Sequence, residues 1–142
     1  MVGSGQLEAL AAVAPPNVER LPWISYEQLP GEYRRAGCAL GIFGTSGKAA
    51  RVIPNKAYQA LACGTPLVTA DTPAARELLR AEESALLVPP GDAEALADAV
   101  VRVAADSALA RRLSEGGLRA YREHASEQVL GARWRGLLEQ VA

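Results

Sequence analysis

Three short apolar runs, each followed by a segment with helical character, constrain the fold more than any other feature of the sequence. The runs are Cys38–Phe43, Pro66–Ala70 and Ala85–Val88. Continuous apolar runs of this length are typical of strands that are buried on both faces of a parallel sheet. Helices are expected to follow them at about 54–63, 72–80 and 92–105. Strands that alternate with helices predict an α/β, Rossmann-like parallel sheet with helices on both faces.

Further elements are expected on either side of this alternation. Val2–Gly5 has the character of a strand end followed by a tight glycine turn. The other expected elements are a helix at Gln6–Val13, a strand at 17–23, a short helix ending near Ala36, and helices at about 107–122 and 126–141. No internal repeat, low-complexity tract or linker interrupts the chain. We therefore expect one domain, residues 1–142.

Local signals set several helix ends and helix faces. Gly64 is expected to end the 54–63 helix, and Asp92 to cap the helix that follows it. The pair Gly116-Gly117 is expected to weaken or bend its helix. Trp134, with the leucines of the last helix, forms an apolar stripe whose spacing is more typical of a core face than of a ligand site. The alternative is that Trp134 anchors this domain to another domain. His124, the only histidine, is expected to lie on the surface.

Composition excludes several classes of function. The net charge of −1 and the pI of about 5.9 leave no broad basic surface for nucleic acid or for membrane phosphates. Cys38 and Cys63 lie in apolar runs without the spacing of metal ligands, so no metal site and a reducing cytoplasm are expected. No apolar run approaches the roughly 18 residues needed to cross a bilayer.

The segment Tyr33–Ala70 contains no Asp or Glu but holds both lysines, Lys48 and Lys56, together with Arg51. The start of the 54–63 helix offers unpaired N–H groups and about half a positive charge, which suits a phosphate. In an open α/β sheet, ligands bind beyond the carboxyl ends of the strands. The sequence therefore predicts an anion site in the loops after residues 2, 43 and 70. Solvated cations without a ligand remain the alternative.

Two other phosphate-binding motifs fit less well. Gly44–Lys48 follows an apolar strand, as a nucleotide-triphosphate loop does. That motif, however, requires a glycine where Ile42 stands and a hydroxyl residue where Ala49 stands. Gly3-Ser4-Gly5 lacks the third glycine of a dinucleotide fingerprint.

A family resemblance is carried by short motifs whose order and spacing are specific together. They are Val2–Gly5, Asn17–Arg20, Tyr26–Pro30 with Tyr33, Lys56–Val68 (KAYQALACGTPLV), Ala75–Leu79, Ala85–Asp92 and Ala95–Ala97. In this order the chain resembles the C-terminal, donor-binding half of a GT-B-fold glycosyltransferase of family 4. The resemblance implies transfer of a hexosyl group from a nucleotide diphosphate sugar, linked to UDP or GDP, without a cofactor and usually without a metal.

The resemblance also implies roles for individual residues. Lys56 and Arg51 would stabilise the departing nucleotide diphosphate. Trp23 and Ile24, with Ser25, would lie against the nucleobase. The remaining donor-binding candidates are Gly3, Gly5, Gly44, Thr45, Ser46, Lys48, Ile53, Asn55 and Gln59. The turn at Ala70-Asp71-Thr72 would face the same cleft.

Two positions depart from the family pattern. The family usually carries two glutamates eight positions apart, of which the first contacts the donor sugar and the second the ribose. Arg51 and Gln59 occupy these positions here. Gln59 can still donate and accept hydrogen bonds with ribose hydroxyls. Arg51 cannot accept such a bond and is instead suited to a phosphate or an acidic sugar.

The family's N-terminal acceptor domain and most of the first strand of this half have no counterpart in the sequence. We expect membrane association only through the absent part. The first strand would lie between the strands at 18–22 and 66–70, so we expect unpaired strand edges, poor stability and no transferase activity from these 142 residues alone. A non-catalytic nucleotide- or protein-binding module descended from such a domain is the alternative function.

Overall fold

The computed structural model describes residues 14–19, 21 and 23–141. Its elements, in chain order, are α2 (Leu29–Arg35), β1 (Ala39–Leu40), the 3-10 helix η1 (Ala49–Arg51), α3 (Asn55–Ala62), β2 (Leu67–Ala70), α4 (Pro73–Leu78), β3 (Leu86–Val88), α5 (Ala93–Ala105), α6 (Ser107–His124) and α7 (Glu127–Val141). The predicted alternation of strands and helices from residue 38 to residue 105 is thus confirmed. The expected Val2–Gly5 turn and the 6–13 helix lie outside the described residues.

The strands form one parallel sheet in the order β1-β2-β3. Ala39 is paired with Leu67, and Val68 with Leu86, so β2 has a strand on each side. The expectation that a further strand lies between the strands at 18–22 and 66–70 is therefore wrong, because both edges of β2 are already occupied. The described part of the chain adds no second neighbour to β1, whose Leu40 is exposed.

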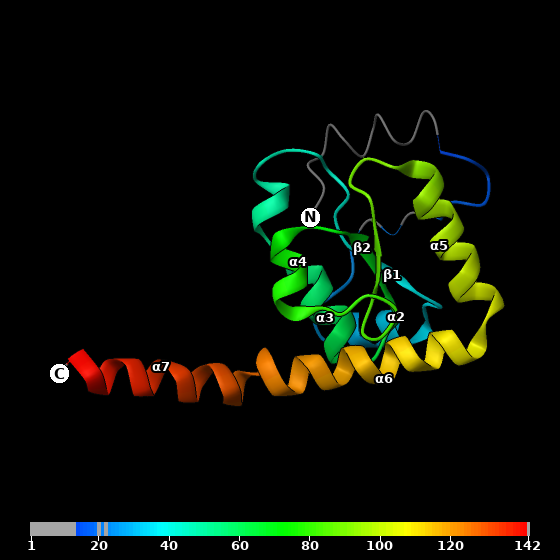
Figure 1. Ribbon diagram of the computed structural model, residues 1–142. Helices are drawn as coiled ribbons and strands as arrows, with labels where there is room; N and C mark the ends of the chain where they lie inside the picture. Colours follow the sequence, from blue (N-terminus) through cyan, green and yellow to red (C-terminus); the bar gives the residue numbers. More distant parts are fainter. Residues whose placement is uncertain (1–13, 20, 22, 142) are drawn as a thin grey trace.

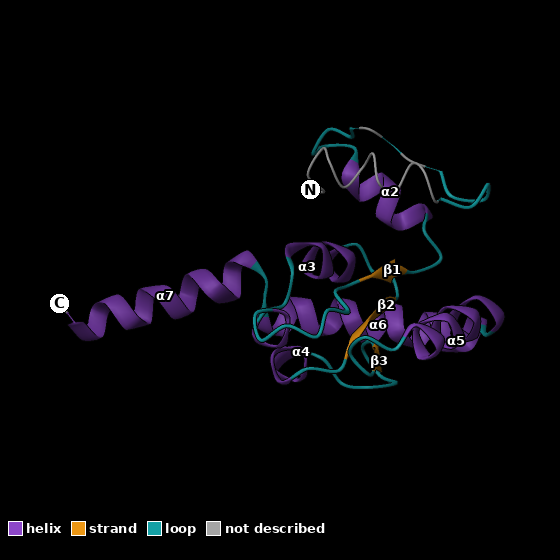
Figure 2. Ribbon diagram, turned by 90° about the horizontal axis from the view of Figure 1, so that it is seen from above, coloured by secondary structure: helices purple, strands orange, loops and turns teal. Residues whose placement is uncertain are grey.

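The two faces of β2 are buried in two separate clusters of apolar side chains. Leu67 packs with α3 and α4, where the cluster includes Leu61 and Leu78. Val68, the next residue, points to the opposite face and packs with α5 and with the first half of α6. Figure 2 shows α3 and α4 on one side of the strands and α5 on the other. The period of two along the strand thus produces the predicted sheet with helices on both faces.

Local signals determine the ends of the central helices. The Asp92 carboxylate accepts a 2.9 Å hydrogen bond from the Ala95 amide and caps α5, as predicted. The Thr72 hydroxyl accepts a bond from the Ala75 amide and caps α4 in the same way. Gly64 has a φ of +68°, the left-handed conformation that ends α3.

The glycine pair of α6 serves close packing and does not interrupt the helix. α6 is continuous from Ser107 to His124, and both glycines are buried. A Cβ atom at Gly116 would collide with the Glu83 carbonyl group, and one at Gly117 would lie 2.8 Å from Leu61 Cδ2. The expectation that the pair weakens or bends the helix was drawn from propensity alone. In the folded chain, these glycines let α6 approach the loop before β3.

The last helix, α7, extends away from the rest of the fold (Figure 1) and has no buried residue. The interpretation of its apolar stripe as a core face is wrong, because Trp134 is 65% exposed and Leu137 and Leu138 are exposed as well. Leu130, the remaining leucine of the stripe, is 43% exposed, so no residue of the stripe is buried in the described structure. The periodicity revealed an amphipathic helix but not what would cover it.

The expected strand at 17–23 is also not formed at the positions that the structure describes there. Val18 and Leu21 are about half exposed, and the Val18 amide donates to the Pro15 carbonyl in a turn. No neighbouring strand is available there to pair with this segment in the described structure. Apolar residues such as Val18 and Leu21 do not form a strand without such a partner.

Candidate functional site

The carboxyl ends of the three strands meet at one edge of the sheet. Just beyond the strand pairs, the Ala70 amide donates to Ile42 (3.0 Å), the Asp71 amide to Val88 (2.7 Å) and the Gly91 amide to Phe43 (2.8 Å). The loops that follow β1, β2 and β3 are thereby held side by side. The loops after residues 43 and 70 lie together, as predicted, whereas the turn with Gly3 and Gly5 lies outside the described residues.

The loop between β1 and α3 is exposed and basic. Gly44, Thr45, Ser46 and Lys48 are all exposed. Within the loop, the Ser46 hydroxyl accepts a 3.2 Å hydrogen bond from the Ala49 amide. Arg51 Nε donates to the Gly47 carbonyl at 2.9 Å, which orients the guanidinium and leaves its terminal nitrogens for a ligand.

The start of α3 lacks a capping side chain. Its N-cap residue is Pro54, which offers no side-chain acceptor to the first amides of the helix. The first helical residue is Asn55, which directly follows Pro54. Asn55 and Lys56 are both exposed in the first turn of the helix. Partial loss of hydration lowers the pKa of the Lys56 ammonium below its usual value, although the residue remains exposed. This end of α3 has the character of an anion site.

The acids at the same edge are engaged elsewhere. Asp71 forms a two-point ion pair with Arg76, with bonds of 2.5 and 2.6 Å, and the Asp92 carboxylate caps α5. No ion pair within the described part of the chain involves Lys48, Arg51 or Lys56. Lys48 and Arg51 thus precede the uncapped end of α3 in the chain, Lys56 lies in its first turn, and none of the three is paired with a carboxylate in that part.

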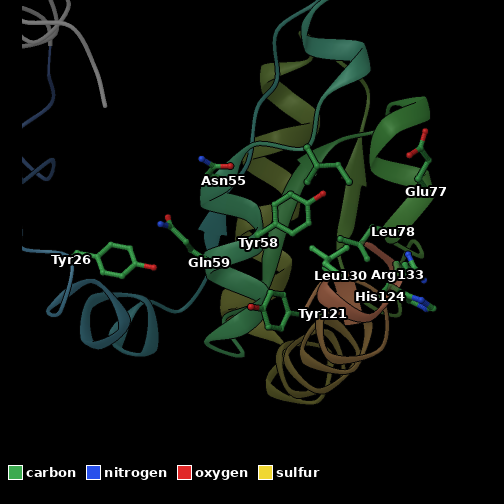
Figure 3. A pocket seen from close by; sticks show the side chains of 12 residues that line it. Tyr26, Asn55, Tyr58, Gln59, Glu77, Leu78, Tyr121, His124, Leu130 and Arg133 are labelled. Atoms are coloured by element: carbon green, nitrogen blue, oxygen red, sulfur yellow. The ribbon is translucent and has the colours of Figure 1, made fainter. Parts of the chain in front are cut away.

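A groove of about 720 Å³ runs along α3 toward α4, α6 and the start of α7 (Figure 3). Three predicted residues, Ile53, Asn55 and Gln59, line it. The other lining residues are Tyr26, Tyr58, Glu77, Leu78, Tyr121, His124, Ala125, Leu130 and Arg133. The groove combines aromatic rings, amides and charged groups, a combination that is typical of sites for polar organic ligands.

The phenols of two tyrosines at α3 have raised pKa values. The Tyr33 hydroxyl donates a 3.1 Å hydrogen bond to Gln59 Oε1, and its burial raises the pKa of the Tyr33 phenol, with a smaller contribution from Cys63. Burial also raises the pKa of the Tyr58 phenol, and the negative charge of Glu77 adds to this effect. Both phenols therefore stay protonated at neutral pH.

The predicted nucleobase residues lie apart from the groove lining. Trp23 is 79% exposed and Ile24 is half-buried, and neither lines the groove, whereas Tyr26 does. His124 is exposed, as expected, but it also lines the groove.

Sequence reasoning did not assign Tyr33, Tyr58 or Glu77 to the site. Tyr58 directly precedes Gln59 on α3, so the sequence alone shows that it lies close to the predicted residues. Glu77 comes from α4, and no spacing in the sequence relates it to α3. Only the packing of the two helices brings it to the groove.

The described residues offer neither a cluster of metal ligands nor a helix that could span a membrane. No group of three or more His, Cys, Asp or Glu side chains there is placed to hold a metal ion. No helix of that part has both the length and the apolar character needed to cross a membrane.

Comparison with known sequences places most of the chain in one family. A sequence model of the family described as "Glycosyl transferases group 1" matches residues 1–106. The chain is also 33% identical, over 129 residues, to a phosphatidyl-myo-inositol mannosyltransferase of Mycobacterium leprae (strain TN). That match covers 87% of this chain and 33% of the relative.

Solved structures show the same likeness. A sucrose-phosphate synthase from Thermosynechococcus elongatus superposes with a TM-score of 0.79 and 28% identity, over 96% of this chain and 34% of that one. The C-terminal domain of a group 1 glycosyl transferase from Francisella tularensis superposes with a TM-score of 0.61 and 17% identity, over 87% of this chain and 62% of that one, and shows the fold alone. The chain spans about a third of the length of the mannosyltransferase and of the synthase.

Proposed function

We propose that this chain, which belongs to the group 1 glycosyltransferases and has the fold of a GT-B C-terminal domain, binds a nucleoside diphosphate sugar and supports transfer of the hexosyl group to an acceptor. The choice of a hexose rests on the relatives, one of which is named for mannosyl transfer. Uridine and guanosine diphosphates are the proposed nucleotide carriers.

One observation carries the proposal. The uncapped N-terminus of α3 follows the loop beyond the carboxyl end of β1, with Lys48 and Arg51 in that loop and Lys56 in the first turn of the helix, while Asp71 is paired with Arg76. Backbone N–H groups and cations together bind a diphosphate more strongly than either alone, because the charge-assisted bonds act on one compact dianion. The proposed cradle comprises Gly44–Lys48, Arg51 and the first turn of α3.

The chemistry asked of this cradle is stabilisation of the leaving group. In the transfer, the bond between the anomeric carbon and the β-phosphate oxygen breaks, and a bond from that carbon to the acceptor oxygen forms. The nucleoside diphosphate leaves with the electron pair, and the acceptor loses its proton. Lys56, Arg51 and the α3 amides would bind the diphosphate more tightly as its charge grows, which lowers the barrier.

We place the acceptor site outside these 142 residues. The groove and the cradle account for the donor, and the relatives are about three times as long as the chain. The other part of such a protein would supply the acceptor pocket and the base that takes the acceptor proton. Transfer is therefore expected only when that part is present.

The test is a calorimetric titration with uridine diphosphate and guanosine diphosphate, each compared with its nucleoside. One of the two diphosphates should bind with a submillimolar Kd and at least about tenfold more tightly than its nucleoside, a difference of about 1.4 kcal/mol. Weaker binding of both diphosphates by protein with a folded circular dichroism spectrum would overturn the proposal.

A further inference from the structure

Gly91, in the loop between β3 and α5, contacts the basic loop Gly44–Lys48, called the 44–48 loop below. Its amide donates a 2.8 Å hydrogen bond to the Phe43 carbonyl, directly before that loop. Two residues farther along, the methyl group of Thr45 lies so close to Gly91 that a Cβ atom there would be 2.8 Å from Thr45 Cγ2. Carbon atoms in contact are normally about 3.5–4.0 Å apart. The approach of the 44–48 loop therefore leaves no room for a side chain at Gly91.

Gly91 is held in place on the side away from Thr45. It follows the pair Pro89-Pro90, whose rings restrict the backbone, and it has a φ of +78°, the left-handed conformation that favours glycine. The next residue, Asp92, caps α5 by accepting the 2.9 Å hydrogen bond from the Ala95 amide. Gly91 therefore cannot retreat from the 44–48 loop without disturbing the start of α5.

A side chain at position 91 would have to be accommodated by the 44–48 loop. Either the backbone of that loop moves away, or Thr45 rotates about its Cα–Cβ bond. The methyl group is the atom nearest to the added Cβ, and the hydroxyl is attached to the same Cβ of Thr45. A rotation that removes the methyl group therefore redirects the hydroxyl as well. Both responses change the polar groups that this part of the proposed cradle presents to a ligand.

We propose that Gly91 is a positioning residue for the diphosphate: it receives the Thr45 methyl group and so fixes the 44–48 loop in the form that binds the ligand. The proposal rests on the proposed function, because it assumes a nucleoside diphosphate at that loop. Gly91 acts without touching the ligand. Even a small displacement of the loop weakens its hydrogen bonds to the diphosphate, because their strength depends steeply on distance and angle. Contacts with the nucleoside part of the ligand are not affected.

The test separates the steric effect of a Cβ at position 91 from the backbone strain that it also causes. Gly91→Ala introduces both. Gly64→Ala is the matched control, because Gly64 has a similar φ of +68° but a Cβ there would lie 3.4 Å from its nearest neighbour, Ser114 Oγ. Thr45→Ser, alone and combined with Gly91→Ala, removes the methyl group and keeps a hydroxyl.

The parent chain and each variant are titrated calorimetrically with uridine and guanosine diphosphates and with their nucleosides, and circular dichroism confirms that each is folded. Gly91→Asn serves as a second variant, because asparagine tolerates the left-handed conformation better than alanine and adds the same Cβ.

Gly91→Ala is expected to weaken binding of the tighter diphosphate by about three- to tenfold, the equivalent of about one hydrogen bond, and binding of its nucleoside by less than about twofold. In the Thr45→Ser background, the same substitution should change the diphosphate affinity by less than about twofold. Gly64→Ala should lower the free energy of unfolding and leave the ratio of the two affinities unchanged.

Three results would overturn the inference: an unchanged diphosphate affinity in Gly91→Ala, an equal loss for diphosphate and nucleoside, or a loss that persists in the Thr45→Ser background. Each of them leaves diphosphate binding by the parent chain intact. Failure of the parent chain to bind either diphosphate would instead refute the proposed function, so the two failures are distinguishable.

Discussion

Replacing Gly116 by alanine is expected to destabilise the chain, although alanine favours an isolated helix. The added Cβ would overlap the Glu83 carbonyl oxygen and lie 2.9 Å from its carbonyl carbon and 3.3 Å from Ser84 Cα. Two carbons attract at about 3.5–4.0 Å, so the backbones must separate by up to roughly 1 Å. The loop cannot move away easily, because the Ser84 hydroxyl is bonded to the Arg80 amide and Arg112 donates to the Glu82 carbonyl.

The magnitude follows from two opposing effects. Overpacking against a fixed backbone costs about 3 kcal/mol at the upper end of its usual range. Alanine returns about 1 kcal/mol through its helix propensity. The expected net loss in the free energy of unfolding is therefore about 2 kcal/mol.

The assay is urea denaturation followed by circular dichroism, and the matched control is Gly31→Ala. Gly31 also lies in a helix, α2, but a Cβ there would meet no atom within 4 Å. The control should be neutral or gain up to about 1 kcal/mol. If Gly116→Ala is as stable as the control, the close approach of α6 to the loop before β3 is not a feature of the folded chain.

Three further predictions concern a cap, the last helix and the titration of the site. Asp92→Ala should cost about 1 kcal/mol and Asp92→Asn much less, since the asparagine oxygen can still accept from the Ala95 amide; equal losses would refute the cap. Trp134→Ser should change the free energy of unfolding by less than about 0.5 kcal/mol, because the ring is exposed; a loss above about 2 kcal/mol would mean that α7 packs on the fold. Lys56 loses its proton at lower pH than an ordinary lysine, and a bound diphosphate would favour its charged form. At a pH between the pKa of Lys56 in the free chain and its pKa in the complex, binding of the diphosphate should therefore be accompanied by uptake of a proton. Calorimetry in two buffers of different ionisation enthalpy detects this uptake, and release of a proton would contradict the reasoning.

The central fold was predictable because its signals are local. Apolar runs marked the three strands, and Gly64 and Asp92 marked helix ends, since a left-handed turn and a cap depend on a few neighbouring residues. The strand order was not predictable in the same way. It depends on which edges of β2 pair, and β1 occupies the edge at which a different neighbour was expected.

The site was predictable in its loops and not in its groove. Parallel strands bring their carboxyl ends together, so the position of the 44–48 loop beside Asp71 followed from the strands alone. Glu77 reaches the groove only through the packing of α4 on α3, which no spacing encodes. The bond from Tyr33 to Gln59 joins residues 26 positions apart and likewise arises from packing.

The most direct test of the account is the effect of Lys56→Ala on diphosphate and nucleoside affinity, with Arg111→Ala as control. Arg111 is an exposed arginine of α6 that does not line the groove. If Lys56 holds the diphosphate, its loss removes a charge-assisted contact and should weaken the bound nucleoside diphosphate by about ten- to hundredfold, while the nucleoside changes by less than about twofold. Arg111→Ala should leave both affinities unchanged. An equal loss of nucleoside and diphosphate affinity in Lys56→Ala, or no loss of either, would contradict the assignment of the α3 start as the diphosphate cradle.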